Sequence, residues 1–196
     1  MARQWLDLRW LDYGDRVPTW VSLLRAVNLG HRNKLNMPAL RESLTRHGFD
    51  DVRTYVQSGN LITRSAHRTP AAVAAAVHTL IADDFGMNVP VIVRSAEQMT
   101  AVVAATPFAA AGARPTHHHV VFLGATPTGD ARKAFEAVDL GPDRAAVIGS
   151  ELYVCYADAS RASRVTGAGR RLGVEGTARN WRTVTTLAQM TAETRR

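Results

Sequence analysis

The sequence has few cysteines, few lysines and no long apolar run. Cys155 is the only cysteine among 196 residues, so an intramolecular disulfide is excluded. It lies in an apolar, strand-like pattern, which is typical of a buried thiol rather than a nucleophile. No stretch of about 18 uncharged apolar residues occurs, so no transmembrane helix is expected. Asp7, Asp12 and Asp15 break the basic-then-apolar order of a signal peptide, and we expect a cytoplasmic protein.

Positive charge outweighs negative charge, and almost all of it comes from arginine. The formal net charge is +7, and Lys34 and Lys133 are the only lysines. Arginine forms bidentate contacts with phosphate and carboxylate groups. General arginine enrichment would also give a basic surface, so the bulk charge leaves both interpretations open. The segment from Arg161 to Arg182 is more specific, because its six arginines face a single acidic residue, Glu175.

Alternating apolar segments and turn residues predict an α+β fold. The order strand, helix, strand, tight turn, strand, helix occurs twice, which indicates two ferredoxin-like halves of the split βαβ type. We expect the halves to pack as one compact unit with an additional C-terminal helix. The chain then divides into an N-terminal extension at 1–17, a first α/β half at 18–107, a linker at 108–116 and a second α/β half with the C-terminal helix at 117–196.

Capping residues mark several predicted helix boundaries. Thr69 precedes a proline and opens a helix with an apolar stripe. Ser95 and Gln98 have the spacing of a capping box at the start of another helix. In the second half we expect Ser160 to cap a helix that ends at Gly173.

Three segments at loop-like positions combine side-chain amides, glycines and arginines. Arg25–Lys34 connects a strand end to a helix start, where free backbone N–H groups and the helix dipole attract anions. Gln57–Asn60 forms a tight turn between strands. Within Thr177–Thr183 we expect Asn180 to cap the last helix, with an arginine on each side. The candidate ligand-binding residues are Arg25, Asn28, Gly30, Lys34, Ser58, Asn60, Arg179, Asn180 and Arg182.

Each of these features also has a structural explanation. Gly30 suits a connecting loop at positive φ, and Ser58 with its following glycine suits a hairpin turn. Trp181 lies on an apolar helix stripe, which is more typical of a core position than of a stacking platform. His117 and His119 share one strand face, which permits metal binding. No Cys, Asp or Glu follows them at ligand spacing, so we expect neither a metal nor another cofactor.

Four stretches carry a resemblance to a known family. They are Val21–Gly30, Asn33–Lys34, Val52–Asn60 and Thr177–Thr183. Together they resemble the bacterial domain-of-unknown-function family numbered 1697, and the similarity extends over residues 20–190. The resemblance implies a small cytoplasmic α+β protein and brings no assigned activity with it.

Three functions remain open at this stage. The first is binding of an anionic, phosphate-bearing partner, either a nucleotide-like small molecule or nucleic acid. The second is an enzyme acting on a phosphorylated or carboxylated small molecule, in which Arg25, Lys34, Arg179 and Arg182 stabilise charge. In the third, the polar motifs are structural and hydrogen-bond the two halves together. A solvent-open cluster favours the first two, and burial with mutual hydrogen bonds favours the third. No membrane partner is expected, and the sequence leaves the oligomeric state open.

Overall fold

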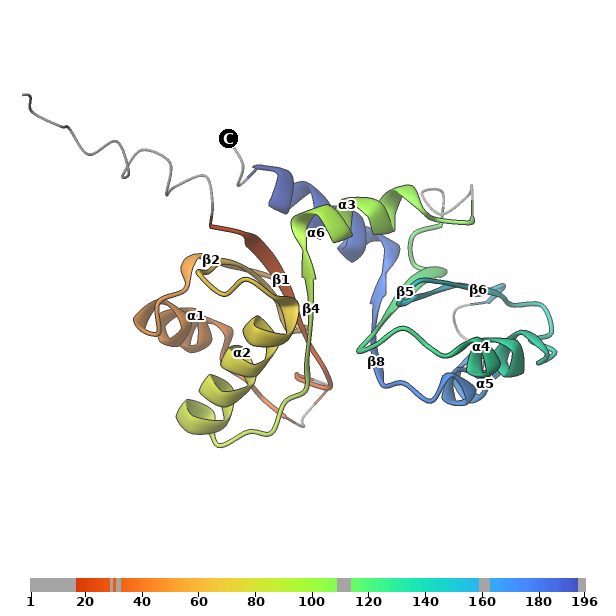
Figure 1. Ribbon diagram of the computed structural model, residues 1–196, viewed down its shortest axis with the longest axis horizontal. Coiled ribbons are helices and arrows are strands. Elements are labelled where there is room, and N and C mark those ends of the chain that lie inside the picture. The colour runs from red at the N-terminus through yellow and green to blue at the C-terminus, as the bar shows by residue number, and fades with distance from the viewer. Residues whose placement is uncertain (1–16, 29, 31–32, 109–113, 159–162, 194–196) are drawn as a thin grey trace, which may run out of the picture.

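The structure, a computed structural model, describes residues 17–28, 30, 33–108, 114–158 and 163–193. Most of the expected N-terminal extension and residues 109–113 of the expected linker therefore lie outside the described residues. The described chain forms two β-sheets that are flanked by helices (Figure 1). In chain order the elements are β1 (Thr19–Leu24), α1 (Met37–Arg46), β2 (Asp50–Tyr55), β3 (Asn60–Arg64), α2 (Pro70–Phe85), β4 (Val91–Ser95), α3 (Ala96–Ala104), β5 (His118–Leu123), α4 (Gly129–Glu136), β6 (Arg144–Ile148), β7 (Glu151–Cys155), α5 (Arg164–Gly169), the 3-10 helix η3 (Arg170–Leu172), β8 (Gly176–Asn180) and α6 (Trp181–Glu193).

The two sheets share one topology. Each has four antiparallel strands, in the order β2-β3-β1-β4 in the first half and β6-β7-β5-β8 in the second. Each half therefore has the βαββαβ arrangement of the ferredoxin-like fold. One further helix follows the last strand of each half, α3 after β4 and α6 after β8. The predicted α+β fold with two ferredoxin-like halves and a C-terminal helix is confirmed.

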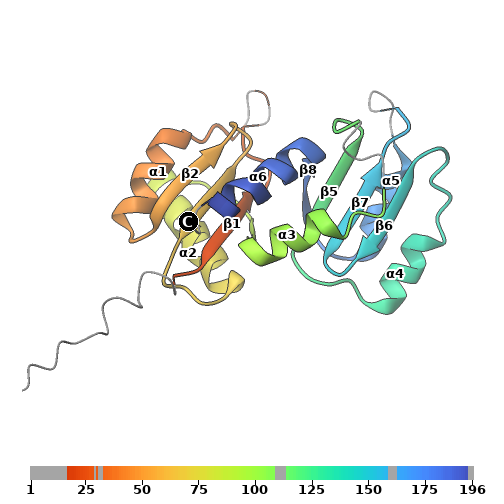
Figure 2. The ribbon, with the colours of Figure 1, turned by 90° about the horizontal axis from the view of Figure 1, so that it is seen from above.

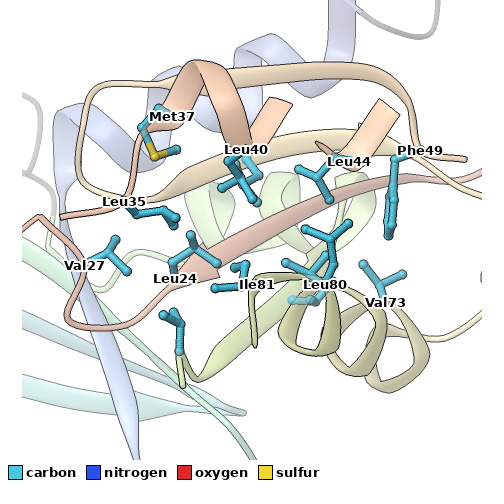
Figure 3. Close-up of a cluster of buried hydrophobic side chains, with 14 of the residues drawn as sticks. Leu24, Val27, Leu35, Met37, Leu40, Leu44, Phe49, Val73, Leu80 and Ile81 are labelled. Atoms are coloured by element: carbon cyan, nitrogen blue, oxygen red, sulfur yellow. The ribbon is translucent and has the colours of Figure 1, made fainter. Parts of the chain in front are cut away.

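Helices α1 and α2 cover one face of the first sheet. Side chains alternate between faces along a strand, and Leu24 of β1 points toward these helices. Leu40 and Leu44 of α1 meet Leu80 and Ile81 of α2 above this strand (Figure 3). Asn36 caps α1 and Thr69 caps α2, the second as predicted, because each side chain accepts a hydrogen bond from the backbone N–H group three residues later.

The corresponding helices of the second half are shorter. We predicted that Ser160 caps a helix running to Gly173, but this helix begins later, at Arg164. The capping hydroxyl belongs to Ser163, which accepts a hydrogen bond from the Val165 N–H at 3.0 Å, and Ser160 lies outside the described residues. Helix α5 has only 6 residues and passes into η3, which ends at Gly173 with φ of 65°. Two glycines inside α5 weaken its helical propensity, consistent with this early end.

A central core joins the two halves. The sheet faces that point away from α1, α2, α4 and α5 contribute apolar side chains to it, among them Val21 and Phe122. Helices α3 and α6 pack side by side between the two halves (Figures 1 and 2). Each of these helices also contacts the other half: Tyr153 of β7 donates a hydrogen bond to a carbonyl oxygen of α3 at 2.9 Å, and Arg53 of β2 donates to one of α6 at 3.0 Å. Each of the two helices thus accepts a hydrogen bond from the other half.

The polar segment Thr177–Thr183 does not form the loop that its sequence suggests. Gly176–Asn180 is the edge strand β8, which pairs with β5 so that His119 lies opposite Asn180. Its small and polar residues resemble a loop, but the open edge of β5 supplies the backbone hydrogen-bond partners that hold it extended. Asn180 nevertheless caps α6 as predicted, because its Oδ1 accepts a hydrogen bond from the Thr183 N–H at 2.9 Å.

Candidate functional site

Arg179 is the fourth residue of β8 and reaches from the second half into the first. The residue is only 8% exposed. Its Nη2 donates to the carbonyl oxygens of Leu24, Ser58 and Gly59 at 2.9, 3.2 and 3.3 Å, and its Nε donates to Oδ1 of Asn60. Its Nη1 donates to two oxygen atoms within β8, each at 2.8 Å. Every guanidinium nitrogen therefore donates to a protein oxygen, so this side chain joins the two halves.

The β2–β3 turn presents these acceptors to Arg179. Asn60 is fully buried, and its Nδ2 donates to the Tyr55 carbonyl at 2.9 Å and to Ser58 Oγ at 3.0 Å. Gly59 adopts φ of 73°, and a Cβ at this position would lie 2.5 Å from the Cγ2 atom of Val27. Only glycine lets the turn pack so closely against the loop that follows β1.

Asn28 connects that loop to the same turn. The residue has φ of 53°, a left-handed conformation that asparagine tolerates better than most residues. Its Nδ2 donates to the carbonyl oxygens of Gln57 at 2.7 Å and Leu35 at 3.1 Å, and its Oδ1 accepts from the Leu35 N–H at 2.8 Å. The three motifs therefore converge through Asn28, the turn and Arg179. Gly30 and Lys34 lie exposed on the same loop.

Arg94 occupies the equivalent place in the first half. It is the fourth residue of β4, as Arg179 is of β8. Its Nη2 donates to the carbonyl oxygens of Leu123 at 2.8 Å and Ser150 at 3.3 Å, at the end of β5 and in the β6–β7 turn. Its Nε donates to Oε1 of Glu151 at 2.8 Å. Each half thus sends an arginine from its last strand to the other half. Sequence analysis missed this relation, because residue identity between the halves is weak.

The two arginines differ in how their charge is balanced. Arg94 meets the carboxylate of Glu151, whereas Arg179 meets the neutral amide of Asn60 at the matching position. No carboxylate pairs with Arg179 in the described part of the chain. Burial lowers the pKa of Arg179 to about 10, so the side chain is still protonated at neutral pH. The site therefore contains a buried positive charge without a counter-charge, an arrangement that favours a nearby anion.

A cavity of about 520 Å³ opens beside Arg179 where the two halves meet. This volume is within the range of small-molecule pockets. Arg182 is exposed and does not line it, although it is a candidate from the sequence. The polar lining consists of four candidate residues from the sequence, Arg25, Ser58, Arg179 and Asn180, and three further residues, His119, Thr177 and Thr183.

His119 lines this cavity, and one of its ring nitrogens has no hydrogen-bond partner among the described residues. Its Nδ1 is buried and makes no hydrogen bond to any described residue. The ring packs edge-on against Tyr156, with 5.3 Å between the ring centroids. Burial is the main cause that lowers the pKa of His119, so the ring is neutral at pH 7. A neutral imidazole nitrogen can donate or accept a hydrogen bond, but Nδ1 is closed to solvent, so a ligand would reach it only after the ring turns. The pairing of β5 with β8 brings His119 here, and no local sequence signal indicates it.

Arg25 lines the cavity and is partly exposed to solvent. Its Nη1 contacts Oε2 of Glu175 at 2.7 Å, and the two side chains are 39% and 73% exposed. Ion pairs this exposed contribute at most about 1 kcal/mol. Its Nε and Nη2 make no hydrogen bond within the described ranges. Arg25 can therefore turn toward an anion at little energetic cost.

The arginines between Arg161 and Arg182 do not act as one group. Arg164 pairs with Asp139 at 2.6 Å, and Arg179 is buried between the halves. Arg182 lies exposed on α6, and Arg161 lies outside the described residues. This dispersal argues less for a continuous nucleic-acid surface than for a small ligand in the cavity.

Two other kinds of site are absent from the part of the chain that the structure describes. No cluster of three or more His, Cys, Asp or Glu side chains is placed to hold a metal ion. None of the helices there has the length and apolar character needed to cross a membrane.

Comparison with known proteins gives a family and a fold. The family model described as "Protein of unknown function (DUF1697)" matches residues 17–153. The solved structure of conserved bacterial protein SP0830 from Streptococcus pneumoniae aligns with a TM-score of 0.67 at 21% identity. The alignment covers 90% of this chain and 99% of that one, and at this identity the likeness concerns the fold alone. No curated protein matches the chain.

Proposed function

The chain belongs to the DUF1697 family, and we propose that it binds a small phosphate- or carboxylate-bearing molecule in the cavity beside Arg179. The observation that carries this proposal is the unbalanced charge of Arg179. The same position in the first half holds Arg94 with its carboxylate partner Glu151, so the fold can neutralise an arginine here. The second-half arginine instead has a neutral amide and an adjacent cavity.

Arg179 would act on the ligand through its charge rather than by direct hydrogen bonds. All its nitrogens already donate to protein oxygens, so a ligand could not bind them without breaking the contact between the halves. Direct contacts would come from Arg25, His119 and Asn180, which line the cavity. Fixed cationic and polar groups in a partly water-excluded site interact strongly with an anion.

The structural interpretation of the motifs applies to part of the site only. Asn28, Asn60 and Arg179 use their hydrogen bonds to hold the halves together. The enzyme interpretation relies on four residues for charge stabilisation. Arg25 and Arg179 line the cavity, but Lys34 and Arg182 do not. Ligand binding therefore accounts best for the groups that remain available.

Isothermal titration calorimetry with inorganic phosphate, pyrophosphate and a nucleoside monophosphate tests the proposal. At least one of these should bind, and Arg25→Ala should weaken its binding roughly 10- to 100-fold, as expected for a charge-assisted hydrogen bond. Arg132→Ala is a matched control, because Arg132 also forms an exposed ion pair of 2.7 Å but lies on α4, away from the cavity. Equal effects of the two substitutions, or no binding of any probe by the unaltered protein, would refute the proposal.

Asn60→Asp tests the role of the unbalanced charge. The substitution keeps an acceptor for Arg179 Nε and supplies the carboxylate that Arg94 has in the other half. Phosphate affinity should fall because Arg179 would then be neutralised. The new carboxylate loses the amide donation to Tyr55, so circular dichroism must first establish that the variant is folded. Unchanged phosphate affinity in the folded variant would show that the charge of Arg179 does not attract the ligand.

A single-stranded RNA probe tests the alternative of nucleic-acid binding. Any affinity for this RNA should be the same in Arg25→Ala as in the unaltered protein.

A further inference from the structure

A second cavity, of about 510 Å³, lies next to the proposed anion site. It separates the second sheet from α5 and η3. Val121, Leu123 and Leu152 line it on the sheet side, and Val165 and Leu172 line it on the helix side. Apolar side chains thus face each other across this cavity, and Thr166, Arg170 and Glu175 add polar groups to its lining.

The cavity exists because the second sheet is incompletely covered. In the first half, the 16-residue helix α2 buries four large aliphatic side chains over its sheet. At the same topological position, α5 has 6 residues and η3 has 3, and α5 contains Gly167 and Gly169. A Cβ atom at Gly169 would have only ordinary contact with Leu152, at 3.9 Å. Space that side chains fill in the first half is thus left open in the second.

The two cavities lie next to each other at the edge strand β8. Arg25, Gly176 and Ala178 line both of them. Arg25 therefore lies at the junction, with Arg170 farther along the rim of the second cavity. Arg170 is exposed and forms no ion pair with any described residue, so the rim carries an excess of positive charge beside an apolar interior.

We infer that the ligand has an apolar body as well as an anionic group, as in an alkyl or aryl phosphate or a medium-chain carboxylate. This inference rests on the proposed function. The anionic group would lie at Arg25 in the first cavity, and the apolar part would extend past Ala178 into the second. The charge at the rim and the apolar walls behind it match such a molecule, whereas a purely polar anion would leave the second cavity unused.

A comparison of methyl phosphate with hexyl phosphate by calorimetry tests the inference. The two probes carry the same anionic group and differ in apolar length. Hexyl phosphate should bind more tightly, by about fourfold for each methylene that enters the cavity. Equal affinities, together with the Arg25 dependence described above, would overturn the apolar extension while leaving the anion site intact. Failure of both probes to bind would instead count against the proposed function.

Gly169→Leu tests the same inference by filling the second cavity with a side chain. Its side chain would enter the second cavity but not the first, and the backbone at this position has φ of −56°, which leucine readily adopts. The hexyl advantage should disappear, while methyl phosphate should bind as before. Gly167→Leu is the matched control, because Gly167 lies on the same helix, outside the cavity, and a Cβ there meets nothing within 4 Å. A persistent hexyl advantage in Gly169→Leu would contradict the inference. Light scattering should give the same molecular mass for Gly169→Leu as for the unaltered protein. A lower mass for the variant would also contradict the inference, since it would identify the second cavity as a contact between copies of the chain.

Discussion

At the scale of single residues, arginines close together in the sequence have different physical roles. Arg179 is buried and donates to oxygens of both halves, whereas Arg182, on the first turn of α6, is exposed. A buried guanidinium is tolerated only where its donors are satisfied, because desolvation is costly. The carbonyl groups of Leu24 and Gly59 depend in turn on this side chain for part of their hydrogen bonding.

Arg179→Met should therefore destabilise the protein by about 1–3 kcal/mol, the usual cost of leaving buried acceptors without their donor. Arg182→Ala should change the free energy of unfolding by no more than about 0.5 kcal/mol, as surface substitutions generally do. Urea denaturation followed by circular dichroism measures both. If Arg179→Met proved as stable as Arg182→Ala, the hydrogen bonds between the halves would contribute little to stability.

At the scale of elements, the β2–β3 turn determines the geometry of the site. Residues from Val56 to Gly59 reverse the chain, with φ of 50° and 73° at these two ends. The turn places the Ser58 and Gly59 carbonyl groups toward Arg179 and lies against the side chains of Leu24 and Val27. A small change in this turn should therefore affect both the stability of the first half and the contact between halves.

Gly59→Ala tests the importance of close packing at this turn. Alanine at positive φ costs about 1–2 kcal/mol in any context. Gly59→Ala should cost roughly 1–3 kcal/mol more, because its Cβ would lie 2.5 Å from Val27 and 2.7 Å from Leu24. Gly48→Ala is the matched control, since Gly48 has φ of 81° but nothing within 4 Å of its Cβ position. Chemical denaturation should thus separate the two variants, and equal losses of stability would mean that the turn moves aside freely.

At the scale of the whole molecule, the two halves are one structural unit. The central core takes side chains from both sheets and from the neighbouring helices α3 and α6. Reciprocal contacts from Arg94 and Arg179 fix the halves on each other. Neither half buries the inner face of its sheet without the other, so neither should be stable alone.

Equilibrium unfolding should therefore be a single transition. Tryptophan fluorescence and far-ultraviolet circular dichroism should give the same urea midpoint, because loss of either half exposes the shared core. Arg94→Met should lower that midpoint without splitting the transition. Two separated transitions, or midpoints that differ between the two probes, would show that the halves fold independently.

The sequence by itself determined the local features of this protein. Thr69, Ser95 and Gln98 act as predicted at their helix starts, and Trp181 is buried on the apolar stripe of α6. The twofold recurrence of strands and helices was sufficient to predict two ferredoxin-like halves. These features could be predicted because capping, turn formation and side-chain periodicity depend on residues a few positions apart.

Only the tertiary structure decided which polar residues meet. Arg179 contacts Asn60, 119 positions away, and Arg94 contacts Glu151, 57 positions away. The strand β8 depends on pairing with the edge of β5, and that pairing also brings His119 to the cavity. Such contacts follow from how sheets and helices pack in three dimensions, and no local sequence pattern encodes them. For the same reason, the difference in charge balance between the two halves, on which the proposed anion site depends, became visible only in the folded protein.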